Sequence, residues 1–207
     1  MITNRKIEDY FYGLLPPRDS LLAEMERTAA KRDIPIVGPA VATLLAQLVR
    51  ISGAKRIFEL GSAIGYSTIW LARAAGPHAE VHYTDGDPLK AREAEGYFRR
   101  AKIAARISVH VGDALGSLGQ TRGKFDFIFN DVDKAGYPAV LEAVSSRLKI
   151  GGLFVTDNTL LHEKVLNPRD AAGRAVVEFN ERLFRSKQFQ SCLVPLRDGV
   201  TVSVKVR

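Results

Sequence analysis

Short apolar runs alternate with helix-like segments between residues 56 and 157, and this alternation constrains the fold more than any other feature. The runs that predict strands cover 56–61, 80–86, 107–112, 125–131 and 152–157, and the segments that predict helices lie near 64–75, 88–103, 114–121 and 136–149. Strands that alternate with helices in this way form a parallel, doubly wound sheet. Such open sheets bind ligands at the carboxyl ends of their strands. The sequence therefore predicts an α/β fold with its site at that edge.

The chain before this region predicts helices. Apolar residues recur at helical spacing within 4–52, so one face of these helices can be buried. Pro16-Pro17 breaks an early helix, and Asp19 or Ser20 can cap the next one. Gly53 is a suitable end for the last helix.

The pattern changes again after residue 157. A helix is predicted near 170–187, and two further apolar runs follow it, at 188–196 and 199–206. Arg197-Asp198-Gly199 separates these runs, and Asp-Gly between apolar runs is typical of a β-hairpin. We therefore expect an antiparallel pair at the end of the sheet, which brings the predicted strands to seven.

Size and composition favour one domain. The chain has 207 residues, is 46% hydrophobic and contains no linker-like segment, so we expect a helical extension (1–52) on a single core (53–207). The single cysteine, Cys192, excludes an intrachain disulfide, fits a reduced cytoplasmic setting and is expected to be buried in a strand. No apolar run is long enough for a membrane span, and no signal peptide is apparent.

The net charge of +7 permits an anionic partner such as RNA. The basic residues are scattered, however, with their densest spots at 99–102 and 182–187, and no basic run is interleaved with aromatic residues. A generally basic, solvated surface explains the same charge.

A glycine loop lies where the first predicted strand turns into the first helix, in Glu59-Leu60-Gly61-Ser62-Ala63-Ile64-Gly65-Tyr66-Ser67. Glycine at such a turn lets a ligand approach the backbone and frees helix N–H groups to face it. Asp85 closes the second strand, 20 residues after Gly65, where a carboxylate can bind ribose hydroxyls. The Gly-x-x-x-Gly spacing argues against a nicotinamide dinucleotide. It favours a nucleoside ligand without a pyrophosphate.

Gly112-Asp113-Ala114 ends the third predicted strand. A polar residue at this place can reach an adenine edge, and the same Asp113 can also cap the following helix. The two roles are compatible.

Two acidic strings follow the fourth and fifth strands, Asp131-Val132-Asp133-Lys134 and Asp157-Asn158. Adjacent parallel strands would bring Asp131, Asp157 and Asn158 together. Two carboxylates and an amide oxygen suit a hard divalent cation, Mg²⁺ above all, with Mn²⁺ or Ca²⁺ as alternatives. Lys134 beside such a cation could act as a general base. A surface ion pair and a turn are the simpler alternative for these strings.

The chain resembles the cation-dependent, S-adenosylmethionine-dependent O-methyltransferases, which include catechol and caffeoyl-CoA O-methyltransferases and bacterial relatives. The resemblance extends from about Ile34 to the C-terminus. It rests on residues 58–72, Gly112-Asp-Ala114, residues 125–134, residues 151–158, and Asp198-Gly199. It implies a Rossmann-like class I methyltransferase fold, a seven-stranded mostly parallel sheet with an antiparallel C-terminal hairpin, and commonly a homodimer.

The resemblance also implies residue roles. Cofactor contacts would come from Val37, Glu59, Gly61, Ser62, Gly65, Tyr66, Ser67, Asp85, Gly112, Asp113, Ala114 and Asp131. Metal ligands would be Asp131, Asp157 and Asn158, and catalysis would involve Lys134 and Asp131. Two positions depart from the family pattern: Asn130 replaces an apolar residue, and Ala63-Ile64 replaces a smaller or more polar pair. Neither change removes a ligand.

The expected activity is methyl transfer to a hydroxyl of a small catechol-like or phenolic acceptor. A tRNA wobble hydroxyuridine is the alternative acceptor, because some bacterial relatives modify it. A non-catalytic S-adenosylmethionine-binding protein is the alternative of another class, and intact Asp131, Lys134, Asp157 and Asn158 argue against it. A nicotinamide dehydrogenase is disfavoured by the glycine spacing.

Overall fold

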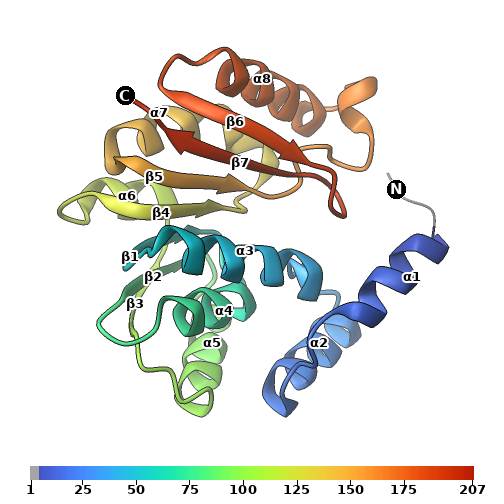
Figure 1. Ribbon diagram of the computed structural model, residues 1–207, viewed down its shortest axis with the longest axis vertical. Helices are drawn as coiled ribbons and strands as arrows, with labels where there is room; N and C mark the ends of the chain where they lie inside the picture. Colours follow the sequence, from blue (N-terminus) through green and yellow to red (C-terminus); the bar gives the residue numbers. More distant parts are fainter. Residues whose placement is uncertain (1–4) are drawn as a thin grey trace.

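The computed structural model describes residues 5–207, and its elements follow the predicted alternation (Figure 1). The helices are α1 (Arg5–Leu14), α2 (Ser20–Arg32), α3 (Gly38–Ser52), α4 (Tyr66–Ala75), α5 (Pro88–Arg100), α6 (Ala114–Gln120), α7 (Tyr137–Arg147) and α8 (Ala171–Arg185), with short 3-10 turns η1 (Lys134–Gly136) and η2 (Lys164–Leu166). The strands are β1 (Arg56–Leu60), β2 (Glu80–Asp85), β3 (Arg106–Val111), β4 (Phe125–Asn130), β5 (Leu148–Thr156), β6 (Phe189–Val194) and β7 (Val200–Lys205).

The strands form one seven-stranded sheet in the order β3-β2-β1-β4-β5-β7-β6. The first five strands of the chain are mutually parallel, whereas β7 runs antiparallel to both β5 and β6. The predicted mostly parallel sheet and its C-terminal hairpin are therefore confirmed. The order turns back between β1 and β4, and such a switch point opens a crevice at the carboxyl ends of the strands.

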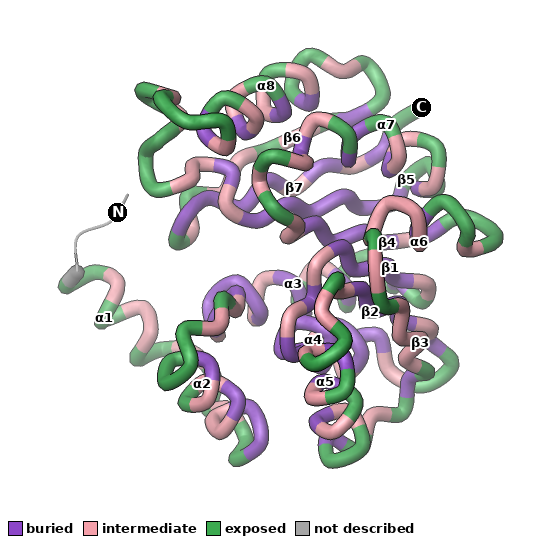
Figure 2. The backbone as a smooth tube through the Cα atoms, turned by 180° about the vertical axis from the view of Figure 1, so that it is seen from behind, coloured by how far each residue is buried: buried purple, intermediate pink, exposed green. Residues whose placement is uncertain are grey.

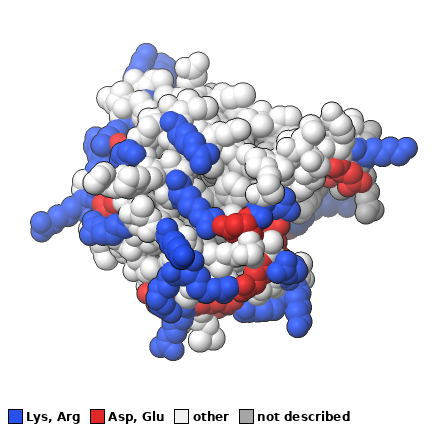
Figure 3. Space-filling model, turned by 60° about the horizontal axis from the view of Figure 1, so that its bottom comes forward, with Lys and Arg blue, Asp and Glu red and all other residues white. Residues whose placement is uncertain are grey.

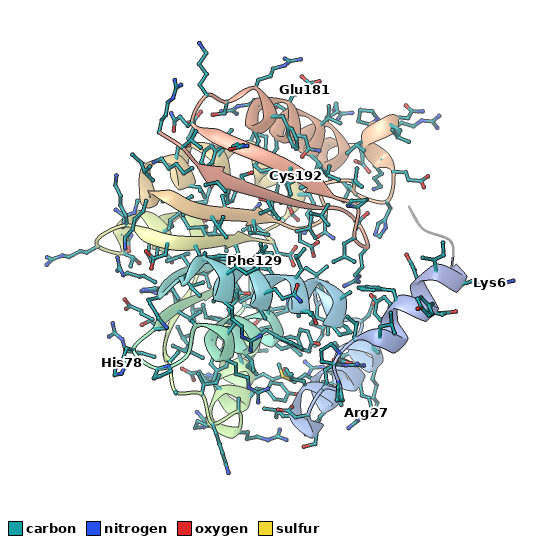
Figure 4. The ribbon with its side chains drawn as sticks, in the orientation of Figure 1. Lys6, Arg27, His78, Phe129, Glu181 and Cys192 are labelled. Atoms are coloured by element: carbon teal, nitrogen blue, oxygen red, sulfur yellow. The ribbon has the colours of Figure 1, made fainter. Side chains whose placement is uncertain are left out.

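Helices cover both faces of the sheet, and buried residues concentrate in the strands (Figure 2). Successive residues of β4 point to opposite faces, so Phe127 and Phe129 pack with α3 and α4 whereas Ile128 packs with α7 and α8. Phe129 lies at the centre of the molecule (Figure 4). Its strand is apolar on both faces, as expected for a parallel strand covered by helices on each side.

Local signals explain where the helices begin and end. The carboxylate of Asp19 accepts a hydrogen bond from the N–H of Leu22 and caps α2, as predicted. Gly53 adopts a left-handed conformation with φ of 65° and ends α3. Asp87 caps α5 ahead of Pro88.

Two details differ from the sequence prediction. The strand β5 begins at Leu148, so it includes residues assigned to the preceding helix and to a loop. Cys192 lies in a strand as expected but is exposed, because β6 is an edge strand (Figure 4). Among residues 5–207, no helix has the length and apolar character needed to cross a bilayer.

Candidate active site

A large pocket of about 1390 Å³ lies at the carboxyl ends of the parallel strands. This volume exceeds the common range of about 300–1,000 Å³ for a single small-molecule site, so it can hold a nucleoside together with a second molecule. Most residues predicted from the sequence line it: Val37, Gly61, Ser62, Tyr66, Ser67, Asp85, Gly112, Asp113, Ala114, Asp131, Lys134, Asp157 and Asn158. Glu59 and Gly65 are not among the lining residues.

Gly61 and Gly65 of the loop are each required to be glycine, for different steric reasons. Gly61 has φ of 79°, and a Cβ there would lie 2.7 Å from the backbone oxygen of Asp131, so only glycine lets β1 and β4 approach at the pocket. Gly65 has φ of 83°, and a Cβ there would lie 2.5 Å from the ring of Phe98. Gly65 therefore serves the packing of the loop against α5.

Glu59 lies beneath the glycine loop and is fully buried. Its carboxylate accepts a hydrogen bond from the hydroxyl of Thr68 at the start of α4. Burial raises the pKa of Glu59 to about 7, and the hydroxyls of Ser67, Thr68 and Ser62 oppose this shift. In this structure Glu59 joins β1 to α4, and it supports the pocket from below.

Asp85 shapes the other side of the loop. Its carboxylate accepts hydrogen bonds from the N–H of Ala63 at 2.9 Å and from the N–H of Asp87 at 2.8 Å. Farther along the pocket, Asp113 caps α6 by accepting a hydrogen bond from the N–H of Gly116 at 2.6 Å. The capping role predicted for Asp113 is thus confirmed, and both carboxylates also line the pocket.

Lys134 and Asp131 form an ion pair at the end of β4. The Lys134 ammonium lies 2.6 Å from Oδ1 of Asp131 and 3.2 Å from the backbone oxygen of Val132. Both side chains are about one-fifth exposed, at 21% and 20%. Burial raises the pKa of Asp131, and the charge of Lys134 opposes that shift.

Asp157 and Asn158 follow β5, the neighbour of β4 in the sheet. The N–H of Asp157 donates to the backbone oxygen of Asn130 at 3.0 Å, which places the residues after the two strands side by side. Asp157 is buried, and its Oδ1 accepts a hydrogen bond from the N–H of Asn158 at 2.9 Å. Tyr137 holds the same segment by donating to the backbone oxygen of Asp157 at 2.8 Å.

The donor set fits a divalent cation. Burial raises the pKa of Asp157, and the nearby charge of Asp131 raises it further. Because the carboxylates of Asp131 and Asp157 repel each other, they favour a cation with a charge greater than one. The amide oxygen of Asn158 completes a set of oxygen ligands of the kind that such cations prefer. Among residues 5–207, no group of three or more His, Cys, Asp or Glu side chains is arranged to hold a metal.

Asn130 is fully buried, and neither its Oδ1 nor its Nδ2 has a hydrogen-bond partner in the described part of the chain. It stands opposite Leu60 of β1 and Thr156 of β5 in the sheet. Its backbone nonetheless makes the regular contact with Asp157. The departure from the family pattern therefore leaves the strand end intact and places an unpartnered amide opposite Thr156, whose Oγ1 also has no partner among the described residues.

Several pocket residues were not predicted from the sequence. The apolar side chains Ile36, Leu160, Val165 and Leu166 also line the pocket, and the turn between β6 and β7 adds Arg197 and Asp198. His162, to which sequence reasoning gave no role, also lines the pocket. The Asp198-Gly199 hairpin signal was the only indication of these lining residues, because loop residues carry no periodic pattern.

A Rossmann-like sheet with an antiparallel last hairpin, a glycine loop after β1 and an acidic residue at the end of β2 defines a class I S-adenosylmethionine-dependent methyltransferase. Comparison with known proteins makes this class specific. The O-methyltransferase family profile matches residues 17–206. The chain therefore belongs to the O-methyltransferase family.

Individual relatives agree with this assignment. A catechol O-methyltransferase from Niastella koreensis is 31% identical over 185 residues, covering 86% of this chain and 84% of the relative. A caffeoyl-CoA O-methyltransferase from Eucalyptus gunnii is 30% identical, covering 79% and 71%. The crystal structure of an O-methyltransferase from Bacillus cereus in complex with SAH has a TM-score of 0.89 at 30% identity, covering 99% of this chain and all of the other. The protein is thus an S-adenosylmethionine-dependent O-methyltransferase of the catechol and caffeoyl-CoA type.

Proposed function

We propose that this enzyme transfers a methyl group from S-adenosylmethionine to one hydroxyl of a small catechol-like or phenolic acceptor, with a divalent cation bound by Asp131, Asp157 and Asn158. The observation that carries this proposal is the presence of all three side chains, and of Lys134, in the same pocket as the glycine loop. Mg²⁺ suits these oxygen donors best, and Mn²⁺ or Ca²⁺ could replace it.

The cofactor would occupy the side of the pocket formed by β1, β2 and β3. Gly61, Ser62, Tyr66 and Ser67 would surround its methionine and ribose end, with Val37 opposite them. Asp85 would bind the ribose hydroxyls, as a carboxylate at the end of the second strand does in related folds. The adenine would then lie against Gly112, Asp113 and Ala114.

Lys134 would move the acceptor proton. In the structure its ammonium is held by Asp131, so the pair keeps the base at the point where both strands end. When bound, the cation supplies Lewis-acid chemistry that lowers the pKa of an acceptor hydroxyl. With a cation at the Asp131 carboxylate, the Lys134 ammonium would be displaced and would lose one of its protons to solvent, and the neutral amine that remains could accept the proton of the acceptor hydroxyl. Orientation of the acceptor by the pocket walls supplies much of the remaining rate enhancement.

The charges of the pocket favour a small acceptor over RNA. Eight acidic residues line it (Glu8, Asp85, Asp113, Asp131, Asp133, Asp157, Glu163 and Asp198), against three Lys and Arg residues (Lys90, Lys134 and Arg197). Carboxylates in this excess repel the phosphates of a polynucleotide. The basic residues stand elsewhere on the surface, and in Figure 3 they point in several directions with acidic residues among them. The apolar lining residues Leu160, Val165 and Leu166 suit an aromatic ring.

The test is methyl transfer from labelled S-adenosylmethionine to a catechol panel and, separately, to bulk tRNA, each with Mg²⁺ and with EDTA. EDTA-sensitive transfer to a catechol is expected. Transfer to tRNA alone would move the function to RNA modification, and equal transfer with EDTA would remove the cation from the mechanism. Cofactor binding without transfer to any acceptor would support the binding-only alternative.

We also propose that the enzyme is a homodimer. Helix α1 projects from the body of the molecule (Figure 1) and exposes Ile7, Tyr10 and Leu14 by 54%, 71% and 65%. These residues share one helical face, which a second copy would bury. Light scattering should show a dimer that Leu14→Glu dissociates. Ile51→Glu, on the exposed side of α3, should leave the dimer intact, and a monomeric wild type would refute the proposal.

A further inference from the structure

Arg197 occupies an unfavourable backbone conformation in the turn between β6 and β7. The turn is closed by a hydrogen bond of 2.9 Å from the N–H of Gly199 to the backbone oxygen of Leu196. Arg197, the second residue of this turn, has φ of 50°. A positive φ at this position favours glycine, and a side chain with a Cβ is strained there. Such strain in a pocket residue calls for a compensating interaction.

The Arg197 side chain makes that interaction with a segment 160 residues earlier in the chain. Its Nη1 donates to the backbone oxygen of Val37 and, at 3.2 Å, to that of Ile36. Both carbonyls belong to the linker between α2 and α3, and both of these linker residues line the pocket. The guanidinium therefore joins two parts of the pocket lining that are far apart in the sequence.

Gly38 provides the room for this contact. It has φ of 69°, and a Cβ there would lie 2.8 Å from Nη1 of Arg197. A side chain at this position would therefore require the guanidinium to shift. The glycine and the arginine thus fit each other across the two segments.

The turn itself is anchored to the loop after β5. One carboxylate oxygen of Asp198 accepts a hydrogen bond from the N–H of His162, and the other accepts one from Nδ2 of Asn158 at 3.4 Å. The backbone adds a bond of 2.9 Å from the N–H of Leu160 to the oxygen of Asp198. Because Asp198 is buried, this anchorage is well shielded from water. These hydrogen bonds fix the position of the turn, and with it the position from which Arg197 binds the linker.

We propose that Arg197 is a positioning residue that fixes the α2–α3 linker, and with it Val37, against the cofactor-binding side of the pocket. Without this contact the linker would sample positions in which the pocket wall is incomplete. Cofactor affinity would then fall in proportion to the fraction of molecules with an ordered linker. The inference depends only on cofactor binding, and it is independent of the acceptor and of the cation.

The test compares Arg197→Gly with Lys102→Gly. Lys102 also has a positive φ, of 49°, is exposed, and does not line the pocket, so glycine relieves backbone strain at both positions. Three quantities would be measured in the absence of acceptor and metal: thermal stability, SAH affinity by calorimetry, and amide hydrogen exchange in residues 34–38.

Arg197→Gly should retain or raise the melting temperature, because glycine adopts this backbone readily. Its linker amides should exchange faster, and its SAH affinity should fall by about tenfold if the linker is ordered in about one molecule in ten. Lys102→Gly should match the wild type in exchange and affinity. Wild-type exchange and affinity in Arg197→Gly would overturn the proposal. A drop in melting temperature with unchanged linker exchange would also overturn it, since that would indicate a purely structural role.

Discussion

The ammonium of Lys134 lies 2.6 Å from the carboxylate of Asp131, three residues earlier and directly after strand β4. The pair combines the proposed base and a proposed metal ligand in one ion pair. Removing Lys134 should therefore affect chemistry more than cofactor binding, whereas Asp131 is also an expected cofactor contact. Neither side chain holds the glycine loop through a described hydrogen bond.

Lys134→Met should lower kcat by about 10²–10⁴-fold, the usual contribution of a general base. Lys134→Arg should be similarly inactive, because arginine keeps the charge but cannot accept a proton at neutral pH. SAH affinity should stay within about threefold of wild type in both variants, since Lys134 is not among the proposed cofactor contacts. Steady-state kinetics and calorimetry check these outcomes. Substantial activity in Lys134→Arg would exclude Lys134 as the base.

Asp157→Ala should abolish metal-dependent turnover, by at least about 100-fold, because a Lewis-acid cation contributes several kcal/mol to such a step. Cofactor binding should remain largely intact. Asp133→Asn is the matched control, since Asp133 lines the same pocket but caps η1 through the N–H of Ala135. Titration with Mn²⁺, followed by electron paramagnetic resonance, should show weakened binding in Asp157→Ala only. Full activity in Asp157→Ala would refute the mechanism.

Asn130→Leu should raise the free energy of unfolding by about 1 kcal/mol, because an apolar side chain of similar size replaces two buried polar atoms without partners. That corresponds to roughly 2–4 °C in melting temperature for a chain of this size. Asn180→Leu should instead lower the free energy of unfolding, because it removes a hydrogen bond that the side chain makes. Although Oδ1 of Asn180 also lacks a partner, its Nδ2 donates to the backbone oxygen of Thr159 at 2.7 Å. A destabilised Asn130→Leu would show that the amide has a stabilising role.

The buried His82, which lies beside the partly buried His110, should make the protein sensitive to acid. Nδ1 of His82 lies 2.9 Å from Nε2 of His110, and the two rings stack beside Phe58. Burial lowers the pKa of His82 to about 4, although Glu80 opposes the shift. The unfolded chain takes up this proton near pH 6.5 and the folded chain does not. Stability from His82 is therefore complete above pH 6.5 and is lost as the pH falls towards 4.

Thermal unfolding between pH 7.5 and 4.5 checks this dependence. His82→Phe should show a shallower decrease in melting temperature over this range than the wild type. His78→Gln is the control, because His78 is exposed in the loop before β2, at the periphery of the molecule (Figure 4). Identical slopes for the wild type and His82→Phe would contradict the proposed origin.

Much of the fold could be predicted from the sequence because it depends on local patterns. Apolar runs, Asp87 before Pro88 and the Asp198-Gly199 turn each mark an element or its end, and the structure confirms them. The same holds for the side chains at the strand ends. Once the sheet is parallel, Asp85, Asp131 and Asp157 must meet at one edge, and they do.

Tertiary packing decided what no local pattern encodes. Only the structure shows that Glu59 accepts a hydrogen bond from Thr68 and that Gly65 lies against the ring of Phe98, and the cofactor contacts expected of both residues stay predictions. It placed Cys192 inside, but the strand order leaves β6 at an edge. The partner of Arg197 lies 160 residues away, and nothing near Arg197 in the sequence indicates it.

The division has a physical reason. Strand and helix patterns reflect which face of a segment is buried, and the chain specifies this within a few residues. The sequence by itself thus determined the sheet, the glycine loop and the acidic strand ends. The burial of Glu59, the exposure of the edge strand β6 and the hydrogen bonds of Arg197 depend on segments distant in the chain. Only the tertiary structure decided those features, because only folding brings such segments into contact.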